Sequence, residues 1–130
     1  MAARLRTHVL VAAGGFAGAN ARWLLAVFLP GLGGTLAANV LGAFALGAVV
    51  ASVAAGRLTP ATRAALATGF LSSFTTYSTF AMESATAGSP TVLIGNVVAN
   101  YALGFAAAAA GMVLARRLVG ATGQAGGEPA

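Results

Sequence analysis

The sequence has few charged residues and lacks cysteine, lysine and aspartate altogether. Only 7% of its 130 residues are charged, whereas 58% are hydrophobic. A soluble domain of average composition has about 25% charged residues, which it uses to cover its surface. So few charges exclude a soluble globular domain. The lack of cysteine excludes a disulfide framework, an iron–sulfur cluster and a thiolate zinc site.

Groups that could perform catalysis are equally scarce. With one histidine, His8, and two acidic residues, the chain offers no triad, no acid–base dyad and no metal cluster. Its glycine-rich stretches match neither the dinucleotide-binding fingerprint nor the phosphate-binding loop of nucleotide-hydrolysing proteins. We therefore predict that the protein is not an enzyme.

Long apolar stretches are what the sequence does contain. Three prolines, Pro30, Pro60 and Pro90, stand beside turn-forming residues and divide the chain into four apolar pieces of similar length. A helix needs about 20 apolar residues to cross a bilayer, and each piece is long enough. The pattern predicts an all-α integral membrane protein whose transmembrane helices span, approximately, the following residues: 8–29, 33–55, 64–86 and 91–115.

The two ends of the chain allow alternatives. Arginines near the N-terminus, followed by an apolar run, also fit a signal peptide with a cleavage site at Ala19–Ala21. Because the apolar run resumes at Trp23 and is too long for a typical signal core, we favour an uncleaved first helix. Residues 120–130 have little apolar content to bury, so we predict a disordered tail after a four-span domain at residues 1–119.

The arginines indicate the topology. With four spans, six of the seven arginines fall on one side of the membrane, and the turns near Pro30 and Pro90 on the other side have none. These six are Arg4, Arg6, Arg57, Arg63, Arg116 and Arg117. The positive-inside rule then places both termini in the cytoplasm, with the protein in the cell membrane. Because the arginines are spread and do not cluster on one face, we do not expect nucleic-acid binding.

Polar side chains also lie inside the spans, where they are costly and usually have a role. Arg22, near the extracytoplasmic end of the first span, either snorkels to the interface or forms a positive vestibule for an anion. In the second span, Asn39 and Thr35 share a helix face. Asn96 and Asn100 are one turn apart in the fourth span. These groups either bond to a neighbouring helix or line a pathway.

The densest polar group is the segment Ser72–Phe80, which contains six serine and threonine residues and one tyrosine. Serine and threonine hydroxyls compete for backbone hydrogen bonds, which weakens a helix. A break at membrane depth is tolerated only where it lines a cavity or is buried in protein, and the freed carbonyls can bind a hard cation such as Na⁺. We predict a break in the third helix; an unbroken helix packed by its hydroxyls is the alternative.

Small residues favour close helix packing and oligomerisation. Gly14 and Gly18 form a small-xxx-small pair, and Gly104 and Gly111 share a face of the fourth span. A four-helix unit of this size has little interior of its own, so we expect it to assemble with a second subunit.

Four sets of residues, one in each span, occur in a characteristic order. They are Gly14–Ala19 with Arg22 and Trp23; Gly34–Leu36 with Asn39, Gly42, Phe44 and Gly47; Gly69 and Phe70 with Thr75–Phe80 and Glu83; and Asn100 with Tyr101. Together they resemble the Fluc (CrcB) family of small fluoride channels. The third set is the most specific, and the resemblance extends over residues 14–111.

The resemblance implies an antiparallel dimer with two narrow fluoride pores. It also implies a structural Na⁺ at the dimer centre, not transported, held by the backbone carbonyls of Ser72 and Thr75. Arg22 would lie in a vestibule. The fluoride pathway would involve Asn39, Tyr77, Phe80, Thr35, Ser78, Thr79 and Tyr101. The expected function is passive, fluoride-selective export from the cytoplasm, which protects against fluoride toxicity.

This chain departs from the family pattern in two places. Ser72 and Ser73 stand where the family usually has two glycines, and Tyr77 stands where phenylalanine is usual. The one-sided arginine distribution further predicts a single insertion orientation, and hence pairing with a second, oppositely oriented homologue. Two other functions are alternatives. A small multidrug-type proton-coupled exporter needs a carboxylate in its first helix, which is absent here, and a non-transporting assembly subunit would not need the hydroxyl-rich third span.

Overall fold

The structure, a computed structural model, describes residues 2–124, and this part of the chain contains helices and no strands. Three helices are long and apolar enough to cross a membrane: α1 (Ala2–Phe28), α2 (Leu32–Ala54) and α6 (Pro90–Gln124). Between α2 and α6 lie four short helices: α3 (Pro60–Arg63), η1 (Ala64–Leu71), α4 (Ser72–Phe74) and α5 (Tyr77–Ala85).

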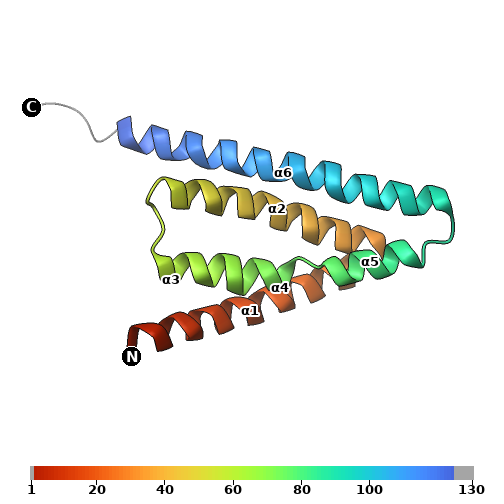
Figure 1. Ribbon diagram of the computed structural model, residues 1–130, viewed down its shortest axis with the longest axis horizontal. Coiled ribbons are helices and arrows are strands. Elements are labelled where there is room, and N and C mark those ends of the chain that lie inside the picture. The colour runs from red at the N-terminus through yellow and green to blue at the C-terminus, as the bar shows by residue number, and fades with distance from the viewer. Residues whose placement is uncertain (1, 125–130) are drawn as a thin grey trace, which may run out of the picture.

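The elements form four antiparallel segments, because α3, η1, α4 and α5 run one after another along the same direction (Figure 1). Both ends of the described chain lie at the same end of the bundle, beside the connection from α2 to α3 (Figure 1). The residues predicted to form the third span make up the third segment, which is broken into these short helices. The predicted tail is partly wrong, since α6 continues to Gln124, while residues 125–130 lie outside the described residues.

The turn residues act as the sequence suggests. Pro60 is the first residue of α3, whose N-cap Thr59 accepts a hydrogen bond from the Thr62 N–H at 3.2 Å. Gly31 and Gly56 have positive φ angles of 73° and 67°, which glycine adopts without steric cost. These residues reverse the chain direction before α2 and before α3.

Glycines bring the backbones of neighbouring helices together. A Cβ atom added at Gly18 in α1 would overlap the carbonyl oxygen of Phe70, so α1 and the end of η1 are in direct backbone contact. In the same way, a Cβ at Gly111 would overlap the carbonyl oxygen of Phe44, where α6 crosses α2. Gly104, predicted to share this role, has no neighbouring atom within 4 Å of its Cβ position.

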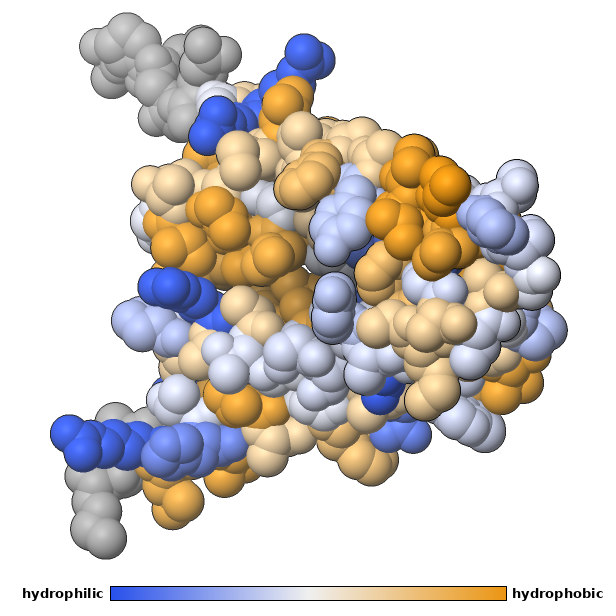
Figure 2. Space-filling view, turned by 45° about the vertical axis from the view of Figure 1, so that its right-hand side comes forward, coloured by the Kyte–Doolittle hydropathy of each residue, from blue (hydrophilic) through white to orange (hydrophobic). Residues whose placement is uncertain are grey.

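The surface of the bundle is apolar. Many large hydrophobic side chains are exposed, including Phe16, Trp23, Phe28 and Phe105, while few are buried. Figure 2 shows hydrophobic residues over much of one face, with the most hydrophilic ones mainly toward the end that holds the termini. An exposed apolar surface of this extent is stable in lipid and not in water. The chain is a multi-pass membrane protein.

Candidate functional site

The third segment of the bundle is interrupted between α4 and α5, at Thr75 and Thr76. Both residues are extended, with ψ angles of 156° and 120°. The Thr75 N–H still donates to the Leu71 carbonyl at 3.0 Å, and so does the Thr75 hydroxyl at 2.9 Å. The Thr76 N–H instead donates to Oδ1 of Asn39 at 2.9 Å. The predicted break is confirmed, and it leaves the Ser72 carbonyl without the N–H that a continuous helix would supply.

The segment before the break is also irregular. Residues Ala64–Leu71 form a π-helix, a wide helix that usually occurs only as single turns at functional sites. Directly after this π-helix, the Ser72 hydroxyl donates to the Thr68 carbonyl. This bond, like that of Thr75, occupies a backbone carbonyl near the break with a hydroxyl of the same segment.

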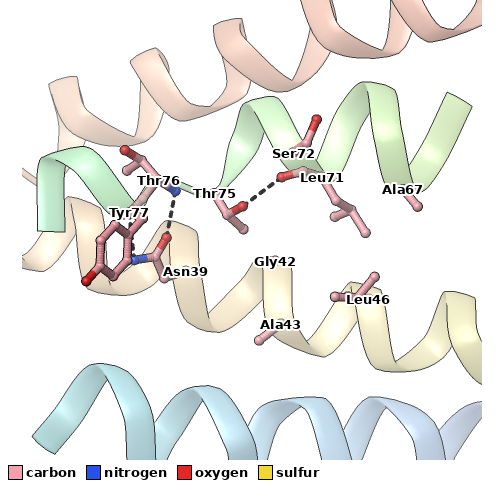
Figure 3. Close-up of a pocket in the computed structure, with 10 residues that line it drawn as sticks. All are labelled: Asn39, Gly42, Ala43, Leu46, Ala67, Leu71, Ser72, Thr75, Thr76 and Tyr77. Carbon is pink, nitrogen blue, oxygen red and sulfur yellow. Dashed lines mark hydrogen bonds between the residues drawn. The ribbon is translucent and has the colours of Figure 1, made fainter. Parts of the chain in front are cut away.

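Asn39 of α2 holds the broken backbone from the side. It accepts from the Thr76 N–H, and its Nδ2 donates to the Thr76 carbonyl at 3.2 Å, so the amide pairs with both polar groups of Thr76 (Figure 3). Nδ2 also donates to Oδ1 of Asn100 in α6 at 3.1 Å. A side-chain amide has two donor hydrogens, and both are used by these bonds. Asn39 therefore ties the break to α2 and α6.

The hydroxyls after the break start the next helix. Thr76 is the N-cap of α5: its Oγ1 accepts from the Thr79 N–H at 3.2 Å and donates to the Thr79 hydroxyl at 3.0 Å. Ser78 is exposed, and its hydroxyl lies 3.3 Å from the same Oγ1. The hydroxyl run that predicted the break thus also supplies the cap that restarts the helix.

Aromatic rings follow one another along α5 and α6. The Tyr77 ring lies 5.8 Å from Phe80, and Phe80 meets Tyr101 edge to face, with centroids 6.0 Å apart and planes at 89°. Tyr101 lies 6.3 Å from Phe105. Phe80 is 6% exposed, whereas Tyr77 is 73% exposed. A pocket of about 180 Å³ is lined by Tyr77, Phe80 and Tyr101 together with Asn39.

A second pocket lies near Arg22. It has a volume of about 220 Å³, and its lining includes Arg22 of α1, Thr35 of α2, and Thr76 and Thr79 at the start of α5. The predicted pathway residues are therefore not in one place. Asn39 and the aromatic rings share one pocket, the guanidinium and hydroxyl groups share another, and Thr76 lies between Asn39 and the second pocket.

The break itself opens into a larger pocket of about 440 Å³ (Figure 3). Its lining includes Ser72 and Thr75, the two residues predicted to present carbonyls, along with Asn39 and Gly42. A Cβ atom at Gly42 would overlap the Thr75 side chain. A larger residue at position 42 would therefore displace the Thr75 side chain at the break.

Two hydrogen bonds between helices have partners that the sequence does not specify. The Thr35 hydroxyl donates to Oε1 of Glu83 at 2.8 Å, and Oε2 of Glu83 is buried without a hydrogen-bond partner among the described residues. In the second, Asn96 of α6 donates to the Ser84 hydroxyl at 2.9 Å. For Asn96, the alternative of a bond to a neighbouring helix is confirmed. Ser84 gives no signal of its own, because a single serine in a helix is common.

Comparison with known proteins agrees with the motifs. The family model described as CrcB-like protein, Camphor Resistance (CrcB), matches residues 9–112. The chain is 50% identical to fluoride-specific ion channel FluC 1 of Haloarcula marismortui over 117 residues, 89% of this chain and 91% of the relative. It is 57% identical to FluC 1 of Natronomonas pharaonis over 105 residues, 78% of this chain and 87% of the relative. FluC 2 of Halobacterium salinarum is 46% identical over 113 residues, 85% of this chain and 87% of the relative.

Proposed function

The chain belongs to the CrcB-like family, and on this premise we propose that it is a fluoride-specific ion channel, not an enzyme. One observation carries the proposal beyond the names of its relatives. Asn39, Tyr77, Phe80 and Tyr101 come from three different helices, yet they line one pocket beside the break. They are the amide, ring and hydroxyl groups that the family resemblance assigns to the fluoride pathway.

The groups in this pocket suit a small, strongly hydrated anion. Fluoride gives up its water shell only where hydrogen-bond donors replace it, and the hydroxyls of Tyr77 and Tyr101 are such donors. The Phe80 ring presents a positively polarised edge. Both amide hydrogens of Asn39 are occupied, one by the Thr76 carbonyl and one by Asn100. Asn39 therefore binds the ion by giving up its bond to Asn100.

The pocket beside Arg22 is the vestibule in this proposal. Its guanidinium attracts the anion, and the hydroxyls of Thr35 and Thr79 line the same space. Ser78 is exposed next to the Thr76 cap and lines neither pocket, so in this proposal it meets the ion outside them. Passive flow through this path exports fluoride from the cytoplasm and protects the cell from fluoride toxicity.

The channel is a dimer in this proposal because one subunit leaves polar groups uncovered. Ser72, Tyr77, Ser78 and Thr79 are exposed in the middle of the third segment. Polar side chains and irregular backbone do not face lipid, since hydrocarbon offers no hydrogen-bond partner. An antiparallel second subunit, as the family resemblance implies, covers them.

A structural Na⁺ fits the residues at the break. The Ser72 carbonyl has lost the Thr76 N–H to Asn39, and Thr75 is extended, so both residues can present backbone oxygen, which hard cations prefer. Two carbonyls are only part of a coordination shell, and the open pocket leaves the rest to the partner subunit. If Na⁺ is held here, replacing Na⁺ with a large organic cation will lower the thermal stability of the dimer in detergent. Equal stability in both buffers would remove the ion from the proposal.

The arginines support one orientation in the cell membrane. Six of the seven belong to segments that lie at the same end of the bundle (Figure 1): the start of α1 (Arg4, Arg6), the connection from α2 to α3 (Arg57), the end of α3 (Arg63) and the last part of α6 (Arg116, Arg117). We propose that this end faces the cytoplasm and that the partner is an oppositely oriented homologue. Because the chain has no cysteine, single cysteines at Gly88 and Leu58 report the two ends cleanly. In intact cells, an impermeant thiol reagent will label Gly88→Cys and spare Leu58→Cys; equal labelling would contradict a fixed orientation.

The function itself is tested by fluoride efflux from liposomes that contain the purified chain, with chloride efflux measured alongside. Fast, fluoride-selective efflux from the chain alone would establish the channel and would show that it pairs with itself. Efflux only after co-reconstitution with a homologue of opposite arginine bias would support the mixed dimer. Absence of fluoride-selective efflux in both preparations would overturn the proposed function.

A further inference from the structure

The orientation of α5 depends on a chain of hydrogen bonds that runs through two other helices. From these hydrogen bonds we infer that Ser84 and Asn96 are positioning residues. They fix the orientation of α5 and thereby place Tyr77 and Phe80. The inference rests on the proposed function where it concerns conduction. Neither residue touches the aromatic pocket, so both act through the chain that links them to Asn39.

The chain starts at Thr76 and ends at Ser84, at opposite ends of α5. Asn39 pairs with the Thr76 backbone and donates to Oδ1 of Asn100 at 3.1 Å. Asn100 Nδ2 donates to Asn96, both to its carbonyl at 3.1 Å and to its Oδ1 at 3.0 Å. Asn96 Nδ2 then donates to the Ser84 hydroxyl at 2.9 Å. The bonds pass from α2 to α6 and return to α5.

The direction of every bond in this chain follows from backbone groups. The Thr76 N–H can only donate, so Oδ1 of Asn39 must face it, and Nδ2 must therefore face Asn100. The Asn96 carbonyl can only accept, so the Asn100 amide must present Nδ2 to it. Asn96 then accepts with its Oδ1 and has its Nδ2 left for Ser84. Reversing one amide would break bonds at both of its ends.

Helix α5 needs such attachments because it is short. It has nine residues, and a helix of that length is marginal by itself. Its buried residues are Phe80 and Ser84. At its start it is held by the Thr76 cap and Asn39, and near its end by the Thr35–Glu83 bond to α2 and the Asn96–Ser84 bond to α6. Without the bond from Asn96, the end of the helix that carries Tyr77 and Phe80 is held by a side-chain hydrogen bond to α2 but not to α6.

Burial makes the Asn96–Ser84 bond consequential. Asn96 is 7% exposed and Ser84 is 9% exposed, so water does not replace the bond when it is lost. Removing the serine hydroxyl leaves a buried amide hydrogen of Asn96 unpaired. Connected hydrogen bonds also strengthen one another, so the loss propagates through the part-buried bonds of Asn100 and Asn39. The effect reaches the Thr76 N–H, at the far end of α5.

The test compares Ser84→Ala with Ser84→Thr, which restores a hydroxyl at the same position. We expect Ser84→Ala to speed hydrogen exchange of the Thr76 amide about tenfold and to lower fluoride efflux by a similar factor, because a buried hydrogen bond is lost. Ser84→Thr will restore both values. Ser52→Ala removes a hydroxyl that bonds only to the Ala48 carbonyl of its own helix among the described residues, and will change neither.

Hydrogen exchange separates this inference from the proposed function. If the wild-type chain does not conduct fluoride, the exchange rate of the Thr76 amide still tests the chain. Unchanged exchange at Thr76 in Ser84→Ala would overturn the inference, even if the variant were less stable, because that is the result for a merely structural contact. Should Ser84→Ala fail to assemble, Asn96→Ser, whose shorter side chain cannot span from Asn100 to Ser84, provides the same two readouts.

Discussion

The two halves of the third segment are held in place by different physics. Before the break, η1 and α4 pack on α1, and glycine backbones meet: a Cβ at Gly69 would lie 2.6 Å from the Val11 carbonyl oxygen. After the break, α5 contacts α2 and α6, and hydrogen-bonded side chains make the attachments. The first half is fixed by how closely two backbones can approach. The second is fixed by which donor meets which acceptor.

The difference explains how the third segment can contain a break and still hold the helix after the break in one orientation. Glycine contacts set the distance between two helices but do not pair their polar groups. This is sufficient for the half before the break, where the hydroxyls of Ser72 and Thr75 bond to carbonyls of their own segment. Hydrogen bonds add direction, because each donor has one acceptor in line with it. The half that carries Tyr77 and Phe80 is therefore the half whose orientation is specified by polar contacts.

The largest effect is expected from filling the glycine contact of the first half. Gly18→Val places side-chain atoms where the Phe70 carbonyl oxygen lies, so the backbones must separate. Overpacking of this kind costs about 1–3 kcal/mol, and more where the obstacle is backbone. We expect loss of the folded species on size-exclusion chromatography in detergent. Gly95→Val, at a position with no atom within 4 Å, is the control and will elute as wild type.

Asn39→Asp removes hydrogen bonds that hold the break between the two halves. The carboxylate cannot donate to the Thr76 carbonyl or to Asn100, and it adds a negative charge where fluoride must pass. A charge in the interior of a span costs about 2.5–3.5 kcal/mol, enough for a flux reduction of about a hundredfold. Fluoride efflux from liposomes measures it. Undiminished efflux would remove Asn39 from the pathway.

Phe80→Ile tests the second half without removing a hydrogen bond. Its ring contacts Tyr77 and Tyr101, and isoleucine fills part of the space but has no polarised edge. Aromatic contacts contribute about 0.5–1.5 kcal/mol beyond their buried area, so flux will fall by up to about tenfold while the dimer stays assembled. Phe105→Ile, at the exposed end of the same series of rings, will leave flux near wild type. Wild-type flux in Phe80→Ile would instead assign Phe80 to packing.

Tyr77→Phe is expected to have the smallest effect, because it removes a single hydroxyl from the half after the break. It restores the residue that the family usually has and keeps the ring contact with Phe80. Because the change removes only the hydroxyl and keeps the ring, the free energy of unfolding will shift by no more than about 0.5 kcal/mol. Fluoride efflux will stay within about twofold of wild type if the hydroxyl is one of several donors on the path. A larger loss would make the Tyr77 hydroxyl the main donor, and a large gain would show that it obstructs the path.

Much of the architecture could be predicted from the order of residues along the chain. The prolines and glycines marked the turns, and the hydroxyl run in Ser72–Phe80 marked the break, because each acts on the backbone within a few residues. The Gly14–Gly18 pair correctly predicted a close helix contact, but Gly104 did not form one. Whether a glycine faces a neighbour depends on helix rotation, which local sequence does not set.

The pairing of polar groups was decided by the tertiary structure. Thr35 and Asn39 share a helix face, yet Thr35 bonds to Glu83, whereas Asn39 bonds to Thr76 and Asn100. Ser84 carried no signal, and its importance appears only where α6 brings Asn96 against it. Short-range chemistry such as turns, caps and hydrophobicity is written in neighbouring residues, so the sequence by itself determined the membrane character, the segments and the break. Hydrogen bonds between helices join residues 12 to 61 positions apart, and only the folded arrangement decides which donor reaches which acceptor.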